Sequence, residues 1–177
     1  LFGRVNPSGK LPETFYKSHK DCSAHLVGEF AGEKTVSYKE GIFVGYRFNE
    51  TFGVKPEFCF GHGLSYTCFE YKEAVYEASE SGSYITCTIT NTGERAGAEL
   101  VQVYRMVRGQ DILPMPEEVS ELQNMRPSKE LAGFGKIYLN PGETGQIKIA
   151  VKGKVDTSVL GVGSSVEQIC IVVDKEL

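Results

Sequence analysis

The second half of the chain is built from short segments in which apolar and polar residues alternate. In residues 83–90, Ile85, Cys87 and Ile89 fall on one face of an extended strand and threonines fall on the other. Because successive side chains of a strand point to opposite faces, this pattern predicts a sheet with one buried face. Similar short segments occur at residues 100–107, 137–139, 146–151 and 169–173. We therefore predict an antiparallel β-sandwich over residues 69–177.

Turn residues separate these segments. Asn91-Thr92-Gly93 and Asn140-Pro141-Gly142-Glu143 contain Asn and Gly, which tolerate a positive φ, so each is expected to reverse the chain. Residues 106–128 are too many for a simple hairpin, and a helix that starts at Pro116 is predicted there. We expect its apolar stripe to pack on the edge of the sandwich. The stripe consists of Val119, Leu122 and Met125.

The charge and hydropathy of the chain argue against two classes of function, nucleic-acid binding and membrane association. The 177 residues carry a net charge of −4 and show no basic stripe, which argues against nucleic-acid binding. No apolar run reaches the roughly 18 residues of a membrane span, so no membrane association is expected. The chain begins with Leu1 and has no signal-peptide pattern, so we expect a processed product or a piece of a longer protein. Neither a cytoplasmic nor a secreted location is indicated.

The five cysteines show no C-x-x-C pair and no zinc-type spacing. Cys22 and His25 could supply only two ligands, so no metal site and no cofactor are predicted. Isolated reduced thiols, several of them buried, are the favoured interpretation. A disulfide between Cys59 and Cys68 is the alternative. Asn49-Glu50-Thr51 also fits an N-glycosylation acceptor, a triplet that often arises by chance.

Three groups of motifs, in this order, resemble the end of family 3 glycoside hydrolases. The first is Asn6-Pro7-Ser8-Gly9-Lys10-Leu11-Pro12. The second joins residues 40–47 (EGIFVGYR) to residues 60–67 (FGHGLSYT). The third combines residues 91–93, 96–99, 129–134 and 141–143. The resemblance covers residues 1 to about 145, and its first two groups are the most specific.

The resemblance implies a mainly β fold with two parts. Residues 1–68 would be the remnant of an α/β sandwich domain with its interdomain linker, and residues 69–177 a fibronectin type III-like, immunoglobulin-like sandwich. Residues 11–15 would then be a parallel-type strand that lacks its neighbours. Without those neighbours, an exposed apolar surface would drive self-association. This surface would consist of Phe43, Phe48, Phe52 and Phe58.

The resemblance also places the chemistry outside this chain. Retaining glycoside hydrolysis needs two carboxyl groups about 5–5.5 Å apart. In the resembled family the nucleophilic Asp and the acid/base Glu precede the region that corresponds to this chain. No catalytic residue is therefore assigned, and the isolated chain is predicted to be inactive. The partners that the resemblance implies are the upstream catalytic domains and, through the parent enzyme, a carbohydrate substrate.

Several residues of the chain are candidates for a site. For Glu40, a structural bond to backbone amides is favoured over direct contact with a sugar. His62, between two glycines, is interpreted as a turn residue rather than a catalytic base, and Ser65 does not lie in a G-x-S-x-G nucleophile elbow. An acidic cluster is interpreted as a solvated helix start rather than a carboxylate pair. It consists of Glu117, Glu118 and Glu121.

Two functions remain open from the sequence. One is an accessory, non-catalytic segment that braces the catalytic domains of a β-glucosidase-like enzyme. Gly61 and Gly63, flanked by aromatic residues, would then mark a seam between domains. The other is a free-standing module that binds carbohydrate or protein, which should show exposed aromatic side chains on one sheet face. The absence of Trp weakens this second interpretation.

Overall fold

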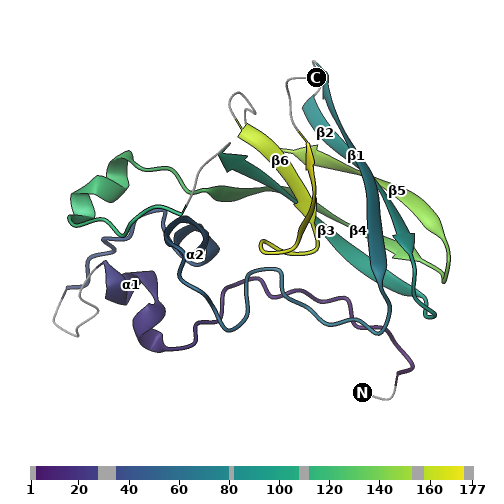
Figure 1. The fold of residues 1–177 in the computed structure, drawn as a ribbon, viewed down its shortest axis with the longest axis horizontal. Helices are drawn as coiled ribbons and strands as arrows, with labels where there is room; N and C mark the ends of the chain where they lie inside the picture. The colour runs from purple at the N-terminus through teal and green to yellow at the C-terminus, as the bar shows by residue number, and fades with distance from the viewer. Residues whose placement is uncertain (1–2, 28–34, 80–81, 108–111, 153–157, 174–177) are drawn as a thin grey trace.

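Two antiparallel sheets form a sandwich at one end of the computed structural model, which describes residues 3–27, 35–79, 82–107, 112–152 and 158–173 (Figure 1). One sheet has the strand order β1–β2–β5, and the other has the order β4–β3–β6–β7. The predicted fibronectin type III-like sandwich is therefore confirmed. Its strands are β1 (Phe69–Ser79), β2 (Gly82–Asn91), β3 (Gly97–Val107), β4 (Lys129–Leu139), β5 (Thr144–Val151), β6 (Ser158–Gly163) and β7 (Ile169–Val173).

The core of the sandwich lies between the two sheets, where the alternating residues meet. Ile85, Cys87 and Ile89 of β2 are fully buried, as their spacing predicts. In the β2–β5 register Ile85 lies opposite Ile149, so the apolar faces of neighbouring strands coincide. The other sheet closes this core from β3, β4 and β6. Its buried contributors are Val101, Val103, Ala132, Leu139, Leu160 and Val162.

The two predicted turns have different structures. Gly142 adopts a φ of +75° and its N–H donates to the Asn91 carbonyl, so the Asn140–Glu143 turn follows the expected chemistry. Gly93, in contrast, does not adopt a positive φ, and the reason predicted for that turn is wrong. A Cβ there would lie 2.8 Å from the Cys68 backbone nitrogen and would also meet the Thr67 hydroxyl. Gly93 is needed because another segment of backbone passes beside it.

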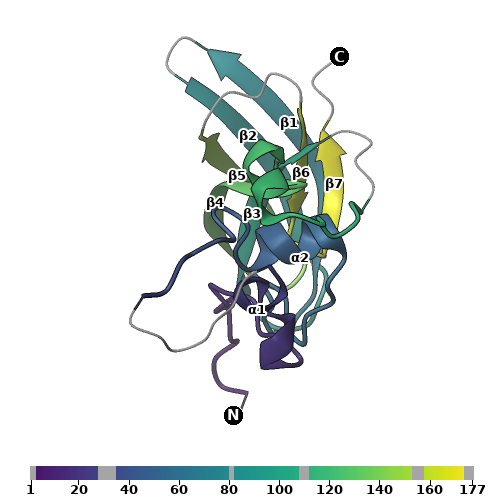
Figure 2. The same cartoon turned by 90° about the vertical axis from the view of Figure 1, so that its left-hand side faces the viewer.

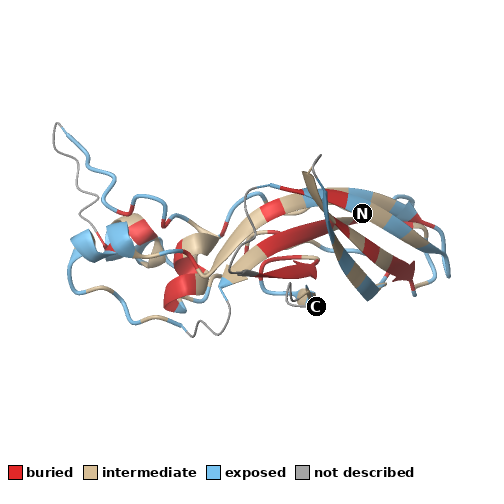
Figure 3. Cartoon of the chain, turned by 90° about the horizontal axis from the view of Figure 1, so that it is seen from above, coloured by how far each residue is buried: buried red, intermediate tan, exposed pale blue. Residues whose placement is uncertain are grey.

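A second, smaller core lies at the other end of the molecule (Figures 2 and 3). It includes Phe43, Phe48 and Phe52, which are at most 8% exposed. The prediction that these side chains form an exposed association surface is wrong, and only Phe58 of that set is exposed. The short helices here are η1 (His19–Asp21), α1 (Ser23–Leu26), α2 (Tyr46–Phe52) and η2 (Val119–Asn124).

The insertion between β3 and β4 supplies part of this second core. The helix predicted from Pro116 is the 3-10 helix η2, and Glu118 caps it instead of lying in its first turn. Leu122 is 4% exposed and packs with the phenylalanines, while Val119 and Met125 pack at the margin. The insertion therefore covers the segment before the sandwich and does not lie on the sandwich edge as predicted. Among the described residues, no helix is long and apolar enough to cross a membrane.

Candidate interdomain site

The segment before the sandwich runs antiparallel to the residues that lead into β1. Leu11 N–H donates to the His62 carbonyl (2.8 Å), and Phe15 N–H donates to the Phe58 carbonyl (2.8 Å). Among the described residues of this pair, only Phe15 and Phe58 form a β-bridge, and it is antiparallel. The prediction of a parallel-type strand at residues 11–15 is therefore wrong. Irregular pairing to residues 57–62 takes the place of neighbours in a larger sheet.

Asn6 fastens the start of this pair to the entry of the sandwich. Its carboxamide oxygen accepts the Tyr66 N–H (2.7 Å), and its amide group donates to the Ser65 hydroxyl (3.1 Å). Gly97 of β3 lies against the same amide, since a Cβ there would be 3.1 Å from the Asn6 side-chain carbon. Ser65 is therefore a structural partner of Asn6, which gives this serine a role other than catalysis.

Lys10 carries the only ion pair in the described part of the chain that links this segment to the interior of the sandwich. Its ammonium lies 3.8 Å from a Glu99 carboxylate oxygen, and the two side chains are 12% and 6% exposed. The Tyr71 hydroxyl donates to the other carboxylate oxygen (2.9 Å). Burial raises the pKa of Glu99, although Lys10 and Tyr71 both act to lower it.

Gly61 brings the loop onto the outer face of β3. Its φ is +83°, and a Cβ there would clash with the Gln102 side chain and lie 3.0 Å from the Ser165 Cα. The side-chain oxygen of Gln102 in turn accepts a hydrogen bond from the hydroxyl of the fully buried Tyr104 (2.5 Å). Gly61 thus lies at the junction between the segment before the sandwich and the sandwich itself (the seam). Only glycine permits both this conformation and this close approach.

Helix α2 makes the second attachment between the two ends of the molecule. The Tyr46 ring lies 4.8 Å from the Phe60 ring and 6.0 Å from the Tyr104 ring, between centroids, and its hydroxyl accepts the Leu131 N–H of β4. Glu50 accepts a 2.5 Å hydrogen bond from Lys129, at the start of β4. These contacts join α2 to β3 and β4 by apolar packing and by charge-assisted bonds.

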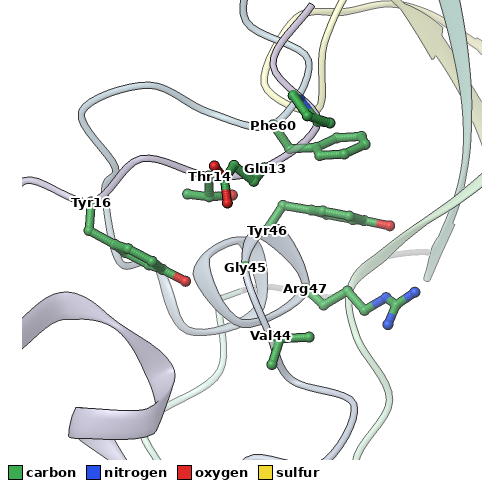
Figure 4. A pocket seen from close by; sticks show the side chains of 9 residues that line it. Glu13, Thr14, Tyr16, Val44, Gly45, Tyr46, Arg47 and Phe60 are labelled. Atoms are coloured by element: carbon green, nitrogen blue, oxygen red, sulfur yellow. The ribbon is translucent and has the colours of Figure 1, made fainter. Parts of the chain in front are cut away.

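A cavity of about 370 Å³ opens beside the first turn of α2 (Figure 4). Thr14, Tyr16, Val44, Tyr46 and Phe60 contribute much of its wall. Burial is the main cause that raises the pKa of Tyr16 to about 12, with smaller contributions from Cys22. The Thr14 hydroxyl is buried and has no hydrogen-bond partner among the described residues.

Apolar side chains are exposed around this cavity and along the paired segment. Val44 is 46% exposed on the cavity wall, and Ile42 next to it is 53% exposed. The rings of Phe15 and Phe58 touch edge to face, with centroids 6.4 Å apart, and both are more than 40% exposed. These side chains are therefore apolar groups that the described part of the chain leaves exposed to solvent.

The residues that the sequence suggested as candidates do not come together. Glu40 is buried and its carbonyl accepts the Phe43 N–H, but it does not line any of the described cavities. The His62 ring lies 4.9 Å from the Phe58 ring, and its backbone N–H and carbonyl bond to Cys59 and Leu11, as a turn residue would. The acidic cluster lies at and beside the start of η2, where Glu118 and Glu121 cap the helix.

The other sequence candidates also have structural explanations. Asn49 is 3% exposed and donates to the Val54 carbonyl (2.7 Å), so it is not accessible for glycosylation. Cys59 is buried, Cys68 is exposed, and both are free, so the alternative of a disulfide is wrong. His25 lies in α1 with its ring 5.4 Å from that of His19, while Cys22 precedes the helix.

Sequence reasoning missed the residues that fasten the seam. Asn6 and Lys10 lie in the first motif, but that motif does not reveal that their partners are Tyr66 and Glu99. Glu99 was noted only as part of a turn-flanking motif. A carboxylate in an otherwise apolar strand was the available signal, since charged residues are rarely buried without a partner.

The fold and the seam define a fibronectin type III-like sandwich to which the end of a preceding domain is fastened. Residues 1–46 match the glycosyl hydrolase family 3 C-terminal domain, and residues 117–169 match the fibronectin type III-like domain. The chain belongs to glycosyl hydrolase family 3 and corresponds to the C-terminal region of these enzymes.

The relatives agree on this placement. The chain is 43% identical over 149 residues to thermostable beta-glucosidase B of Acetivibrio thermocellus and 42% identical over 167 residues to probable beta-glucosidase I of Emericella nidulans. These matches cover 81% and 89% of this chain but only 18% of each relative. The solved structure of beta-glucosidase 3B from Thermotoga neapolitana in complex with glucose matches with a TM-score of 0.77 and 34% identity, over 96% of this chain and 24% of that one.

Proposed function

We propose that this chain is the accessory C-terminal segment of a β-glucosidase-type hydrolase and that it braces the catalytic domains. The observation that carries the proposal is the seam, in which the paired segment and α2 are fastened to the sandwich by Asn6, Lys10 and Lys129. Because this seam holds the end of one domain rigidly on another, it can transmit stability between them. The relatives' names support terminal β-linked glucosides as the substrate class of the parent enzyme.

The exposed apolar surface is the proposed contact with the catalytic domains. It includes Val44 on the wall of the cavity beside α2, together with the exposed side chains of Ile42, Phe15 and Phe58. Covering these side chains would remove apolar surface from water, which stabilises an interface by about 25 cal/mol per Å². The partner-free Thr14 hydroxyl in the same cavity would gain a hydrogen bond from the covering domain. Glu40, which is buried, is proposed to be a structural residue rather than a sugar contact.

The isolated chain is proposed to have no hydrolytic activity of its own. Hydrolysis of a glycosidic bond requires a pair of carboxyl groups across the scissile bond. The family resemblance places both in the preceding domains. Purified residues 1–177 should therefore release no nitrophenol from nitrophenyl β-glucoside above a buffer blank. Sustained turnover that disappears when a carboxylate of this chain is mutated would contradict the proposal.

A chimera tests the bracing role directly. The corresponding C-terminal region of the Acetivibrio thermocellus enzyme would be replaced by this chain, and hydrolysis and thermal inactivation would be measured. We expect the chimera to hydrolyse nitrophenyl β-glucoside and the enzyme without the region to lose activity. Ile42→Asp with Val44→Asp should shorten the half-life of the chimera, because charges would be buried at the interface.

Val75→Asp is the matched control for the chimera. Val75 is 46% exposed on β1 of the sandwich, as Val44 is beside α2, so Val75→Asp and the single variant Val44→Asp each add one charge at an equally exposed valine. Equal loss of activity from Val75→Asp and from Val44→Asp would show that the cavity surface is not the contact. A chimera that remains inactive although it is folded would contradict the bracing role.

A further inference from the structure

A hollow of about 550 Å³ lies on the sandwich side of the N-terminal segment, away from the cavity at α2. Two cations, Arg4 and Arg95, contribute to its wall, and no carboxylate is among the described residues that line it. Lys136 adds a third cation nearby, since its ammonium donates to the hydroxyl of Ser8, which also lines the hollow. In a chain with a net charge of −4, such a concentration of positive charge favours an anionic ligand.

Arg95 is held in place for such a ligand. Its Nη1 donates to the Gly3 carbonyl (2.6 Å), and its guanidinium lies 5.9 Å from the centroid of the Tyr66 ring. A guanidinium carries five N–H donors in a rigid fork, so one bond to a carbonyl leaves donors for a carboxylate. These contacts restrict the rotamers of Arg95 before any ligand binds. The entropy cost of ordering this side chain on binding is therefore smaller.

Two aromatic rings extend the hollow along the outer face of β4. Tyr138 lines the hollow and is 63% exposed, and Phe134 is 66% exposed. Residues four apart on a strand share a face and lie about 13 Å apart, with Lys136 between them. Gly133 and Gly135, which flank Phe134, face the opposite sheet, and Ile137 and Leu139, which flank Tyr138, pack on the core, so both rings lie on the outer face of the sheet. Both rings are therefore accessible to a ligand that lies along β4.

We infer that this basic-aromatic surface (Arg4, Arg95, Phe134, Lys136 and Tyr138) binds an oligosaccharide that carries carboxylate groups, such as a chain of uronic acids. The guanidinium groups pair with carboxylates in bidentate geometry. The aromatic rings contact the apolar C–H faces of pyranose rings. A saccharide fits both features, because its rings present apolar faces while its carboxylates and hydroxyls lie at the edges. This activity goes beyond the bracing role and does not depend on it.

Binding can be measured on the full 177-residue chain by calorimetry, with tetragalacturonate as the acidic probe and cellotetraose as the neutral one. We expect tetragalacturonate to bind and to weaken with added salt, because the exposed charges are screened. Arg4→Gln should weaken binding by about tenfold, since one charge-assisted bond contributes about 1.5 kcal/mol. Tyr138→Ala should weaken it several-fold. Arg126→Gln and Tyr38→Ala, which alter exposed residues elsewhere, should leave affinity unchanged.

Three results would overturn the inference. The first is that tetragalacturonate does not bind, or binds no better than cellotetraose. The second is that Arg126→Gln weakens binding as much as Arg4→Gln, which would show a response to net charge alone. The third is that polyglutamate binds as tightly as tetragalacturonate and responds to the same variants, which would make this surface a contact for acidic protein segments. Circular dichroism of each variant checks that all of them are folded.

Discussion

Replacing Lys10 by Met tests whether a buried charge pair holds the N-terminal segment on the sandwich. Met keeps the apolar stem, which packs against Gly63, and removes only the charge. At 3.8 Å and an effective dielectric constant of about 20, the attraction between Lys10 and Glu99 is about 4 kcal/mol. This value is the upper limit of the loss, because the variant can instead protonate Glu99 and avoid burying an unpaired charge.

The loss must therefore depend on pH. Burial raises the pKa of Glu99 in the folded protein above its ordinary value of 4.5. The contribution of Glu99 to the free energy of unfolding is fully present below pH 4.5. It is lost as the pH rises through the pKa of Glu99 in the folded protein. Without Lys10 the pKa of Glu99 in the folded protein rises further. The free energy of unfolding therefore keeps falling over a wider pH range, by up to about 1.4 kcal/mol per pH unit. The loss of stability in the variant should therefore be larger near pH 8 than near pH 5, with the upper limit of about 4 kcal/mol set by the charge attraction.

Urea denaturation at both pH values measures this difference, and a double-mutant cycle with Glu99→Gln isolates the pair. In the Glu99→Gln background, Lys10→Met should cost little at either pH, because no carboxylate remains to be paired. A loss that is the same at pH 5 and pH 8, or that persists in the Glu99→Gln background, would refute the reasoning. The stabilising effect of Lys10 would then come from packing alone.

Three further predictions follow from the cores and the seam. Gly61→Ala should destabilise the chain by about 1–3 kcal/mol in thermal unfolding, because alanine must adopt a strained φ and displace Gln102; an unchanged Tm would contradict this close approach. Leu122→Ala should cost about 2–4 kcal/mol, and retained stability would show that η2 does not close the second core. In mass spectrometry after alkylation at pH 8, the exposed Cys68 should react long before Cys87, whose pKa burial raises to about 11; equal rates would contradict the fold of β2.

The sandwich was predictable because its information is local. Ile85, Cys87 and Ile89 reveal their strand by spacing alone, and the structure buries all three. Strand β6 was harder to predict, since it contains Gly161 and Gly163, which weaken strand propensity. Its pairing with β3 and β7 depends on distant segments and was left open by the sequence.

The seam was less predictable because it depends on partners far apart in the chain. The phenylalanines of the second core look like an exposed surface until Leu122, some seventy positions later in the sequence, is placed over them. Asn91 shows the same limit. It was assigned to a turn, but it is fully buried and bonds to the Thr67 hydroxyl and to the Arg95 and Leu139 carbonyls. Local turn chemistry cannot reveal such a connecting role.

The position of η2 has a consequence for the order in which the chain folds during synthesis. Thr51 at the end of α2 bonds to Ser128, 77 residues later, and Leu122 from the same insertion covers the phenylalanines around α2. The segment around α2 therefore cannot complete this core when it leaves the ribosome. It must wait until β1, β2 and β3 have been synthesised, and closing so long a loop is slow. During that interval the nascent segment is open to aggregation and to chaperones, although the folded chain buries the same side chains.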